Sequence, residues 1–204
     1  MEERRGGLDG GIAWRRTGAM LLVLLAAAFG LMVATAKGAL AAQFSISGMP
    51  FTVTASSLNG SGFEQFATLD HMAPHSPNAG NTGGQVVVIV SAIQSAELTN
   101  LCQSINLGGS YLKLTAGGDG TPVRATTMVV DSDQLSGDAN FNNISIGQDA
   151  STLTKVNGVT GNLGVFGQQA DTVTINNLRQ QNYATTAAAF TLPNLHMSFT
   201  STGC

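Results

Sequence analysis

The stretch QVVVIVSAI, residues 85–93, decides the fold class of this chain. Six of its nine residues are Val or Ile. Such β-branched side chains lose rotamer freedom in a helix and pack well on a pleated sheet. A run this short and this apolar is typical of a strand that is covered on both faces. It predicts that the chain folds around a β-sheet.

Weaker strand patterns lie on both sides of this run. Phe44, Ile46, Phe51 and Val53 are apolar, and Ser and Thr occur between them with the period of two that a half-buried strand requires. Further strands are expected at residues 111–115, 123–131, 141–146, 172–178, 184–192 and 195–199. Gly-rich stretches predict turns at residues 59–62, 117–120 and 158–164, and Pro and Gly predict a loop over residues 73–84.

Two features complicate this pattern. Leu98, Leu101, Cys102 and Ile105 have helical spacing, so residues 94–105 could form a short helix. An Asn followed by Leu or Ile also recurs along the chain, without the fixed period of a regular solenoid. The positions are Asn100, Asn106, Asn143, Asn162, Asn177 and Asn194.

Composition supports an all-β assignment for residues 43–204. This part is rich in Gly, Ser, Thr and Asn and poor in the long-chain residues that favour exposed helix faces. We expect a single domain, built as an elongated curved or solenoid-like sheet; a β-sandwich is the alternative.

Residues 1–42 form a separate N-terminal region. Arg15 and Arg16 precede eighteen uncharged residues, 19–36, and small residues at Ala39 and Ala41 follow. A charged segment, an apolar segment and an A-x-A pattern are typical of a signal peptide. Cleavage after Ala41 or Ala42 would release the domain, whereas an uncleaved segment 19–36 would be a transmembrane helix that anchors it. Either way, the domain is expected to be exported, in the cell envelope or outside the cell.

The two cysteines fit this compartment. Cys102 and Cys204 both lie in the exported part, and two cysteines in an oxidising environment favour a disulfide over free thiols. Two unrelated thiols remain the alternative. No C-x-x-C pair is present, so thiol oxidoreductase chemistry has no support in the sequence.

Charge excludes one class of partner. After Lys37 the chain has four basic and nine acidic residues, and the basic residues do not cluster. Neutralising phosphates requires such a cluster, so we expect no nucleic-acid partner.

Enzymatic constellations are weak. The G-x-S-x-G motif of lipases and esterases is absent, and Ser61, between two glycines, is the nearest candidate nucleophile. Ser61, His71 and Asp70 can be grouped, but the adjacent Asp and His are poorly arranged for a triad. We therefore assign no catalytic residue.

Metal and cofactor sites are equally weak. His71 and His75 have the spacing of two ligands on a helix, but Pro74 and Pro77 oppose a helix there. Asp131 and Asp133 resemble the start of a calcium loop, which then fails at Leu135; a solvated turn is the simpler reading. Phosphate-binding and dinucleotide motifs are absent. The sequence predicts no metal ligand and no cofactor.

Several strings together resemble a known family. They are AELTNLCQS at residues 96–104, GDANFNNISIG at 137–147, FGQQADT at 166–172 and the stretch 183–190, with Gly60–Phe63 and the final Cys204. With these strings the chain resembles an uncharacterised family of exported actinobacterial proteins of about 200 residues, a domain of unknown function. Its members are often labelled cholesterol esterase. The resemblance implies a cell-envelope setting and no established activity.

The expected function follows from what remains. Strands with one apolar face and no catalytic constellation suggest a non-enzymatic envelope protein that is structural or binds a ligand. An incompletely covered apolar face would accept a lipid or another apolar ligand, and an envelope membrane protein is the other expected partner. An esterase acting on lipid or sterol esters and a self-assembling surface protein are the alternatives. Oligomeric state is not predicted.

Overall fold

A computed structural model describes residues 45–204. The predicted helix or signal segment at 19–36, the cleavage site and the rest of residues 1–42 lie outside this described part. Within it the chain forms nine strands and one short 3₁₀ turn, η1 (Ala150–Thr152). The strands are β1 (Phe51–His71), β2 (Gln85–Thr99), β3 (Leu101–Asn106), β4 (Tyr111–Ala116), β5 (Val123–Asn142), β6 (Ser145–Asp149), β7 (Phe166–Thr186), β8 (Ala189–Thr191) and β9 (His196–Thr200). No helix in residues 45–204 has the length and apolar character needed to cross a membrane.

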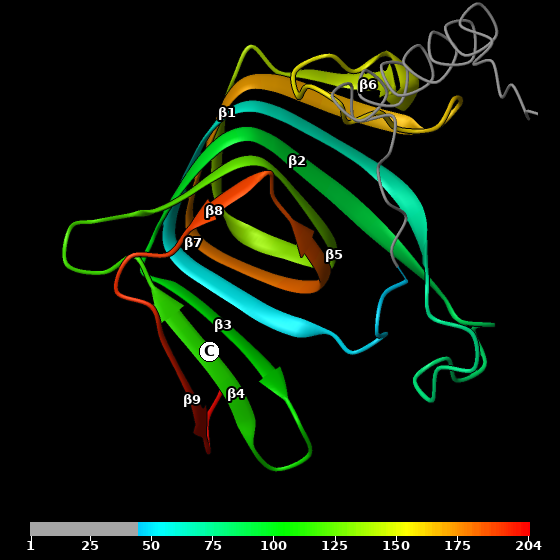
Figure 1. The fold of residues 1–204 in the computed structure, drawn as a ribbon. Helices are drawn as coiled ribbons and strands as arrows, with labels where there is room; N and C mark the ends of the chain where they lie inside the picture. The colour runs from blue at the N-terminus through cyan, green and yellow to red at the C-terminus, as the bar shows by residue number, and fades with distance from the viewer. Residues whose placement is uncertain (1–44) are drawn as a thin grey trace, which may run out of the picture. The chain divides into compact units, whose positions relative to one another are not determined.

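All nine strands belong to one antiparallel sheet, and four of them close it into a ring (Figure 1). β1 pairs with β2 along residues 57–71 and with β7 along residues 51–66. β5 pairs with β2 and with β7. We call β1, β2, β5 and β7 the ring. The all-β class and the curved single sheet are therefore confirmed, and the alternative of two stacked sheets does not apply.

The sheet divides at Asn100. β2 and β3 follow each other along the same edge of β1, and Asn100 lies between them with a left-handed φ of 53°. β5 pairs with β2, whereas β4 pairs with β3 and β9 with β4, so these strands form a second part of the sheet (Figure 1). We call β3, β4 and β9 the branch. The short helix considered for residues 94–105 is wrong: Leu98 and Leu101 are buried from two successive strands on either side of a kink.

The turn predicted at residues 59–62 is also wrong, because Gly60 and Gly62 lie in the middle of β1. A Cβ on Gly60 would lie 2.7 Å from Ile93 Cγ2, so a glycine lets the ring close tightly at this point. Gly62 has a φ of 64°, and a Cβ there would lie 2.4 Å from the carbonyl oxygen of Lys155. Glycine tolerates both conditions, and other residues do not.

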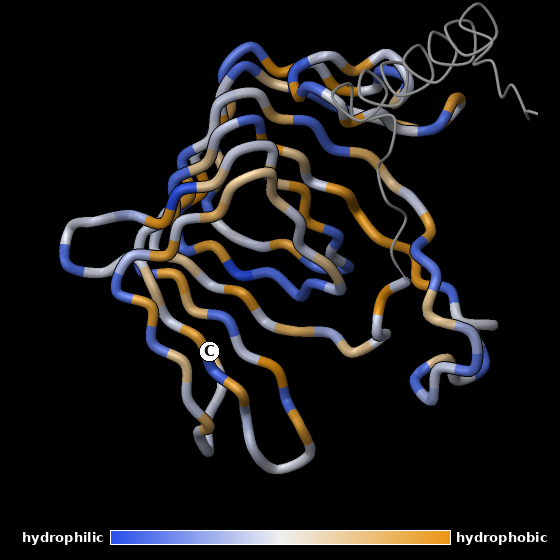
Figure 2. Tube along the Cα trace, viewed as in Figure 1, coloured by the Kyte–Doolittle hydropathy of each residue, from blue (hydrophilic) through white to orange (hydrophobic). Residues whose placement is uncertain are grey.

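The ring has an apolar cluster on each face. Phe63, Ile93 and Val173 belong to the larger cluster on its inner face. Phe66 and Val90 belong to a smaller cluster on the outer face, under residues 150–165, which we call the covering loop. Neighbouring residues of one strand point to opposite faces. Phe63 therefore lies on the inner face, whereas Glu64 and Phe66, one and three positions later, lie on the face under the covering loop. Figure 2 shows apolar and polar positions interspersed along the strands.

Candidate functional site

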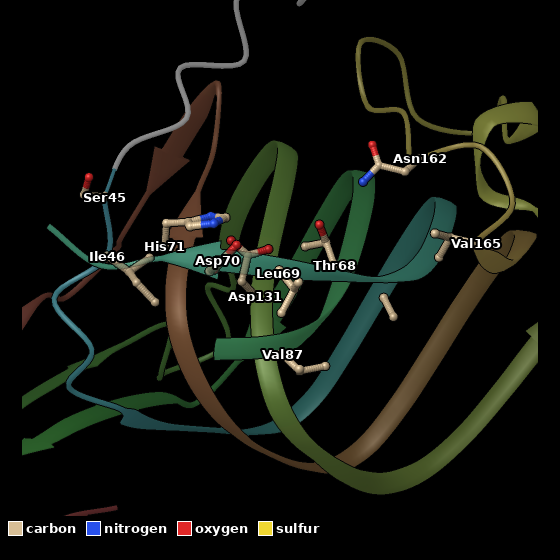
Figure 3. Close-up of a pocket in the computed structure, with 11 residues that line it drawn as sticks. Ser45, Ile46, Thr68, Leu69, Asp70, His71, Val87, Asp131, Asn162 and Val165 are labelled. Atoms are coloured by element: carbon tan, nitrogen blue, oxygen red, sulfur yellow. The ribbon is translucent and has the colours of Figure 1, made fainter. Parts of the chain in front are cut away.

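Two hollows of the described part of the chain differ in the charge of their lining. The first, which we call the acidic hollow, has a volume of about 850 Å³. Its walls come from the end of β1, the start of β2, β5, residues 45–46 and the covering loop (Figure 3). Its distinctive residues are Thr68, Asp70, His71 and Asp131.

Two carboxyl groups dominate the acidic hollow. Burial raises the pKa of Asp131 to about 7, and the charge of Asp70 contributes to this shift. Burial also raises the pKa of Asp70, although His71 opposes the effect. Figure 3 shows the two carboxyl groups close together, whereas Leu69 and Val87 point the other way. Such a pair holds a proton at a pH where an exposed Asp would have lost it.

The acidic hollow lacks the other parts of a hydrolytic site. Ser61 is exposed in the middle of β1, ten residues before His71 on the same strand. At about 3.3 Å per residue, this places them roughly 30 Å apart along the strand. The structure therefore does not bring Ser61 together with Asp70 and His71.

The predicted metal candidates are also separated. His71 ends β1, where its Nε2 lies 3.1 Å from Gln85 Nε2, and His75 lies in the following turn segment with a φ of 64°. Asp131 and Asp133 are in β5, so the reading of this pair as a solvated turn is wrong. Across residues 45–204, no group of three or more His, Cys, Asp or Glu side chains is placed to hold a metal ion.

The second hollow has a volume of about 630 Å³ and lies at the division of the sheet. Apolar side chains from the ring and the branch line it: Phe51, Val53, Leu98, Leu101, Met128 and Val130. The end of β7 and the segment that leads into β8 line the rest. No Asp, Glu, Lys, Arg or His is among its lining residues, and we call it the neutral hollow.

Amides supply the polar groups of the neutral hollow. Gln180 and Asn182 are 6% and 1% exposed, and both belong to its lining. Asn182 pairs with Phe51 of β1 on one side and with Ser132 of β5 on the other. Its Oδ1 atom is buried and has no hydrogen-bond partner within residues 45–204. Buried acceptors in folded proteins are nearly always paired, so this exception asks for an explanation.

Sequence reasoning did not find either hollow. Asn182 was one amide among many, and Asp131 stood out only as part of a failed calcium motif. The lining of the neutral hollow comes from β1, β2, β3, β5, β7 and β8, which are far apart in the sequence. The sequence signal for the neutral hollow was the apolar face that the strands share. This signal predicts an apolar surface but does not locate it in the fold.

The predicted disulfide is present. Cys102 of β3 and Cys204 are bonded, with 6.0 Å between their Cα atoms. The backbone N–H of Cys204 also donates to Ser104 Oγ at 2.9 Å, and Arg179 Nη1 donates to the carbonyl oxygen of Cys204 at 3.0 Å. Disulfides persist in oxidising compartments, so this bond is compatible with an extracellular protein.

Comparison with known proteins places the chain in a family without giving it an activity. The model of a family of unknown function, DUF6230, matches residues 47–204. No curated protein and no solved structure matches the chain.

Proposed function

The chain belongs to the DUF6230 family, and from its geometry we propose that residues 45–204 form a non-enzymatic domain that binds an apolar ligand in the neutral hollow. The observation that carries this proposal is the lining itself. Side chains from the inner face of the ring and from the branch enclose a hollow with a volume of about 630 Å³. Small-molecule sites are typically concave, mostly apolar and of this size, with a few polar groups.

The proposed setting is the cell envelope. Residues 1–42 would export the domain, either as a cleaved signal peptide or as an anchor formed by residues 19–36. The Cys102–Cys204 bond supports an oxidising environment for the domain. A lipid is the apolar ligand that an envelope protein meets most often, which makes lipid-like molecules the first ligands to test.

Two neighbouring alanines allow a matched test. Ala187 lines the neutral hollow, whereas Ala188 is exposed and outside it. We expect Ala187→Phe to fill part of the hollow and to reduce binding of the fluorescent apolar probe N-phenyl-1-naphthylamine at least tenfold. Ala188→Phe adds the same side chain outside the hollow and should bind the probe as the unmodified protein does.

Native mass spectrometry of the purified protein gives a second readout. A co-purified apolar molecule that is lost in Ala187→Phe and kept in Ala188→Phe would support the proposal. Equal probe binding by the two variants, or no probe binding by the unmodified protein, would refute it.

A further inference from the structure

The lining of the neutral hollow restricts which apolar ligands it can bind. This inference rests on the function just proposed. We propose that it takes a single-chain amphipathic molecule whose head group is uncharged and donates a hydrogen bond, such as a hydroxyl or an amide. The head group lies at Asn182, and the chain leaves the hollow along the apolar face of the branch.

The absence of charge in the lining selects the head group. A carboxylate, phosphate or ammonium group that leaves water needs an opposite charge or several hydrogen bonds. The lining of the neutral hollow has no cationic or anionic side chain to offer. It offers amides and hydroxyls instead, from Gln103, Gln180, Asn182, Thr185 and Thr186. These groups suit a neutral polar head and select against an ionised one.

Asn182 selects a donor. Its side chain is 1% exposed, and its Oδ1 atom has no partner in the described chain. A ligand that brings an O–H or N–H group to this oxygen satisfies it, whereas a hydrocarbon leaves it unsatisfied. An unpaired buried acceptor therefore favours ligands that carry a donor.

The branch extends the apolar wall beyond the hollow. Phe51 pairs with Ile105, Ile105 pairs with Leu112, and Leu112 pairs with Phe199. Directly paired residues of antiparallel strands share a face, so these four side chains form one apolar row across β1, β3, β4 and β9. The row starts at Phe51 in the lining of the hollow and ends at Phe199, which is 72% exposed.

The length of the row selects a chain. It crosses three strand spacings of about 4.8 Å, or roughly 14 Å in total. The opposite face of the branch has Cys102, Ser104, Lys113 and Ser198, and Cys204 is bonded there. The branch therefore offers only one apolar face, and that face is continuous with the neutral hollow.

The test compares ligands with the same twelve-carbon chain and different head groups. Dodecanol, glycerol monolaurate, laurate, dodecane and the corresponding lysophosphatidylcholine are added to the unmodified protein that is loaded with N-phenyl-1-naphthylamine. We expect dodecanol and glycerol monolaurate to displace the probe at concentrations at least tenfold lower than the other three ligands.

Two variants locate the head group and the chain. Asn182→Leu should weaken dodecanol binding at least tenfold and leave dodecane binding unchanged, and the matched control Asn140→Leu, at an exposed position of β5, should change neither. Phe199→Ser changes an exposed residue, so it tests the chain even if Asn182→Leu does not fold. It should weaken binding of dodecanol more than binding of hexanol.

The outcomes separate this inference from the proposed function. If laurate binds as tightly as dodecanol, or Asn182→Leu weakens dodecane equally, the head-group assignment is wrong while apolar binding stands. If Phe199→Ser weakens the two alcohols equally, the path of the chain is wrong. If neither the probe nor any of the five ligands binds, the proposed function itself fails.

Discussion

The covering loop and the branch are both attached to the ring, and they are held in opposite ways. The covering loop is held by hydrogen bonds from its backbone, one of which is buried. The backbone N–H groups of residues 154, 156 and 157 donate to side chains on three neighbouring strands, at 2.9, 2.7 and 2.8 Å. The acceptors are Gln169 of β7, Glu64 of β1 and Gln94 of β2.

The branch has few contacts of this kind. It meets the ring edge through four residue pairs between β3 and β1, and one of its faces has exposed Met197 and Phe199. The covalent Cys102–Cys204 bond lies within the branch, where it joins β3 to the last residue after β9, and Arg179 of β7 donates to the carbonyl oxygen of Cys204. The comparison teaches that a loop with a buried apolar underside and paired polar groups needs no covalent bond, whereas a thin extension of a sheet benefits from one.

Breaking the disulfide should have the largest effect. The bond joins residues separated by 102 positions, and closing a loop of this length stabilises a folded chain by about 4–5 kcal/mol in the chain-entropy model. We expect Cys102→Ala with Cys204→Ala to lower the free energy of unfolding by about this amount, as measured by urea denaturation.

Hydrogen exchange shows where the stability is lost. Amides of β3, β4 and β9 should exchange faster in the double variant under native conditions, and amides of β1 and β7 should change much less. Reducing the unmodified protein should reproduce this pattern. Equal acceleration in the ring and the branch would mean that the bond does not stabilise the branch selectively.

The same two regions show what the sequence could predict. Strands with β-branched runs, such as residues 85–93, were predicted correctly because local propensity and the final sheet agree there. Closure of the ring was not predicted, because Gly60 and Gly62 have the local signature of a turn. Their role depends on Ile93 and Lys155, which approach only in the folded chain.

The recurring Asn has a similar explanation. Asn100, Asn143, Asn177 and Asn194 all have a left-handed φ, between 52° and 54°. Asn tolerates this conformation better than other residues with a side chain. These four of the six positions therefore mark kinks and turns of a curved sheet, which need no fixed spacing, whereas Asn106 and Asn162 have no positive φ. The disulfide could be predicted from the expected compartment and the number of cysteines. The neutral hollow could not be predicted, because it depends on how strands that are distant in the sequence diverge in the fold.

Gly62→Ala should have the second largest effect, because it disturbs the attachment of the covering loop. The new Cβ would lie 2.4 Å from the Lys155 carbonyl oxygen and 2.8 Å from Gln94 Cβ, at a φ of 64°. We expect a loss of about 2–4 kcal/mol in the free energy of unfolding, from backbone strain and displacement of the loop.

A glycine of the branch is the control. Gly108, between β3 and β4, has a φ of 81°, and a Cβ added there would have no atom of the described chain within 4 Å beyond its immediate neighbours. Gly108→Ala should therefore lower the free energy of unfolding by only about 1–2 kcal/mol, the strain of a left-handed backbone at a residue with a side chain. If the two variants lose the same stability, close approach of the covering loop does not explain Gly62.

Substitution of Glu64 should have the smallest effect on stability, and this effect should depend on pH. Glu64 is fully buried, its Oε1 accepts from Val156, and its Oε2 has no partner in the described chain. Burial raises its pKa, although the backbone N–H groups of Val156 and Lys155 oppose the shift. A carboxyl whose pKa is higher in the folded chain stabilises that chain at low pH, and this contribution disappears as the pH rises through the folded pKa.

Glu64→Gln keeps an acceptor for Val156 and removes the titration. Its free energy of unfolding, relative to the unmodified protein, should therefore increase with pH. We expect a gain on the order of 1–3 kcal/mol at pH 8 and little difference at pH 4, measured by urea denaturation. Part of the pH dependence should remain in the variant, because Asp131 has its pKa raised to about 7. If the difference in free energy of unfolding between the two proteins does not vary with pH, burial of a Glu64 charge does not destabilise the folded chain. Glu64 would then only anchor the covering loop.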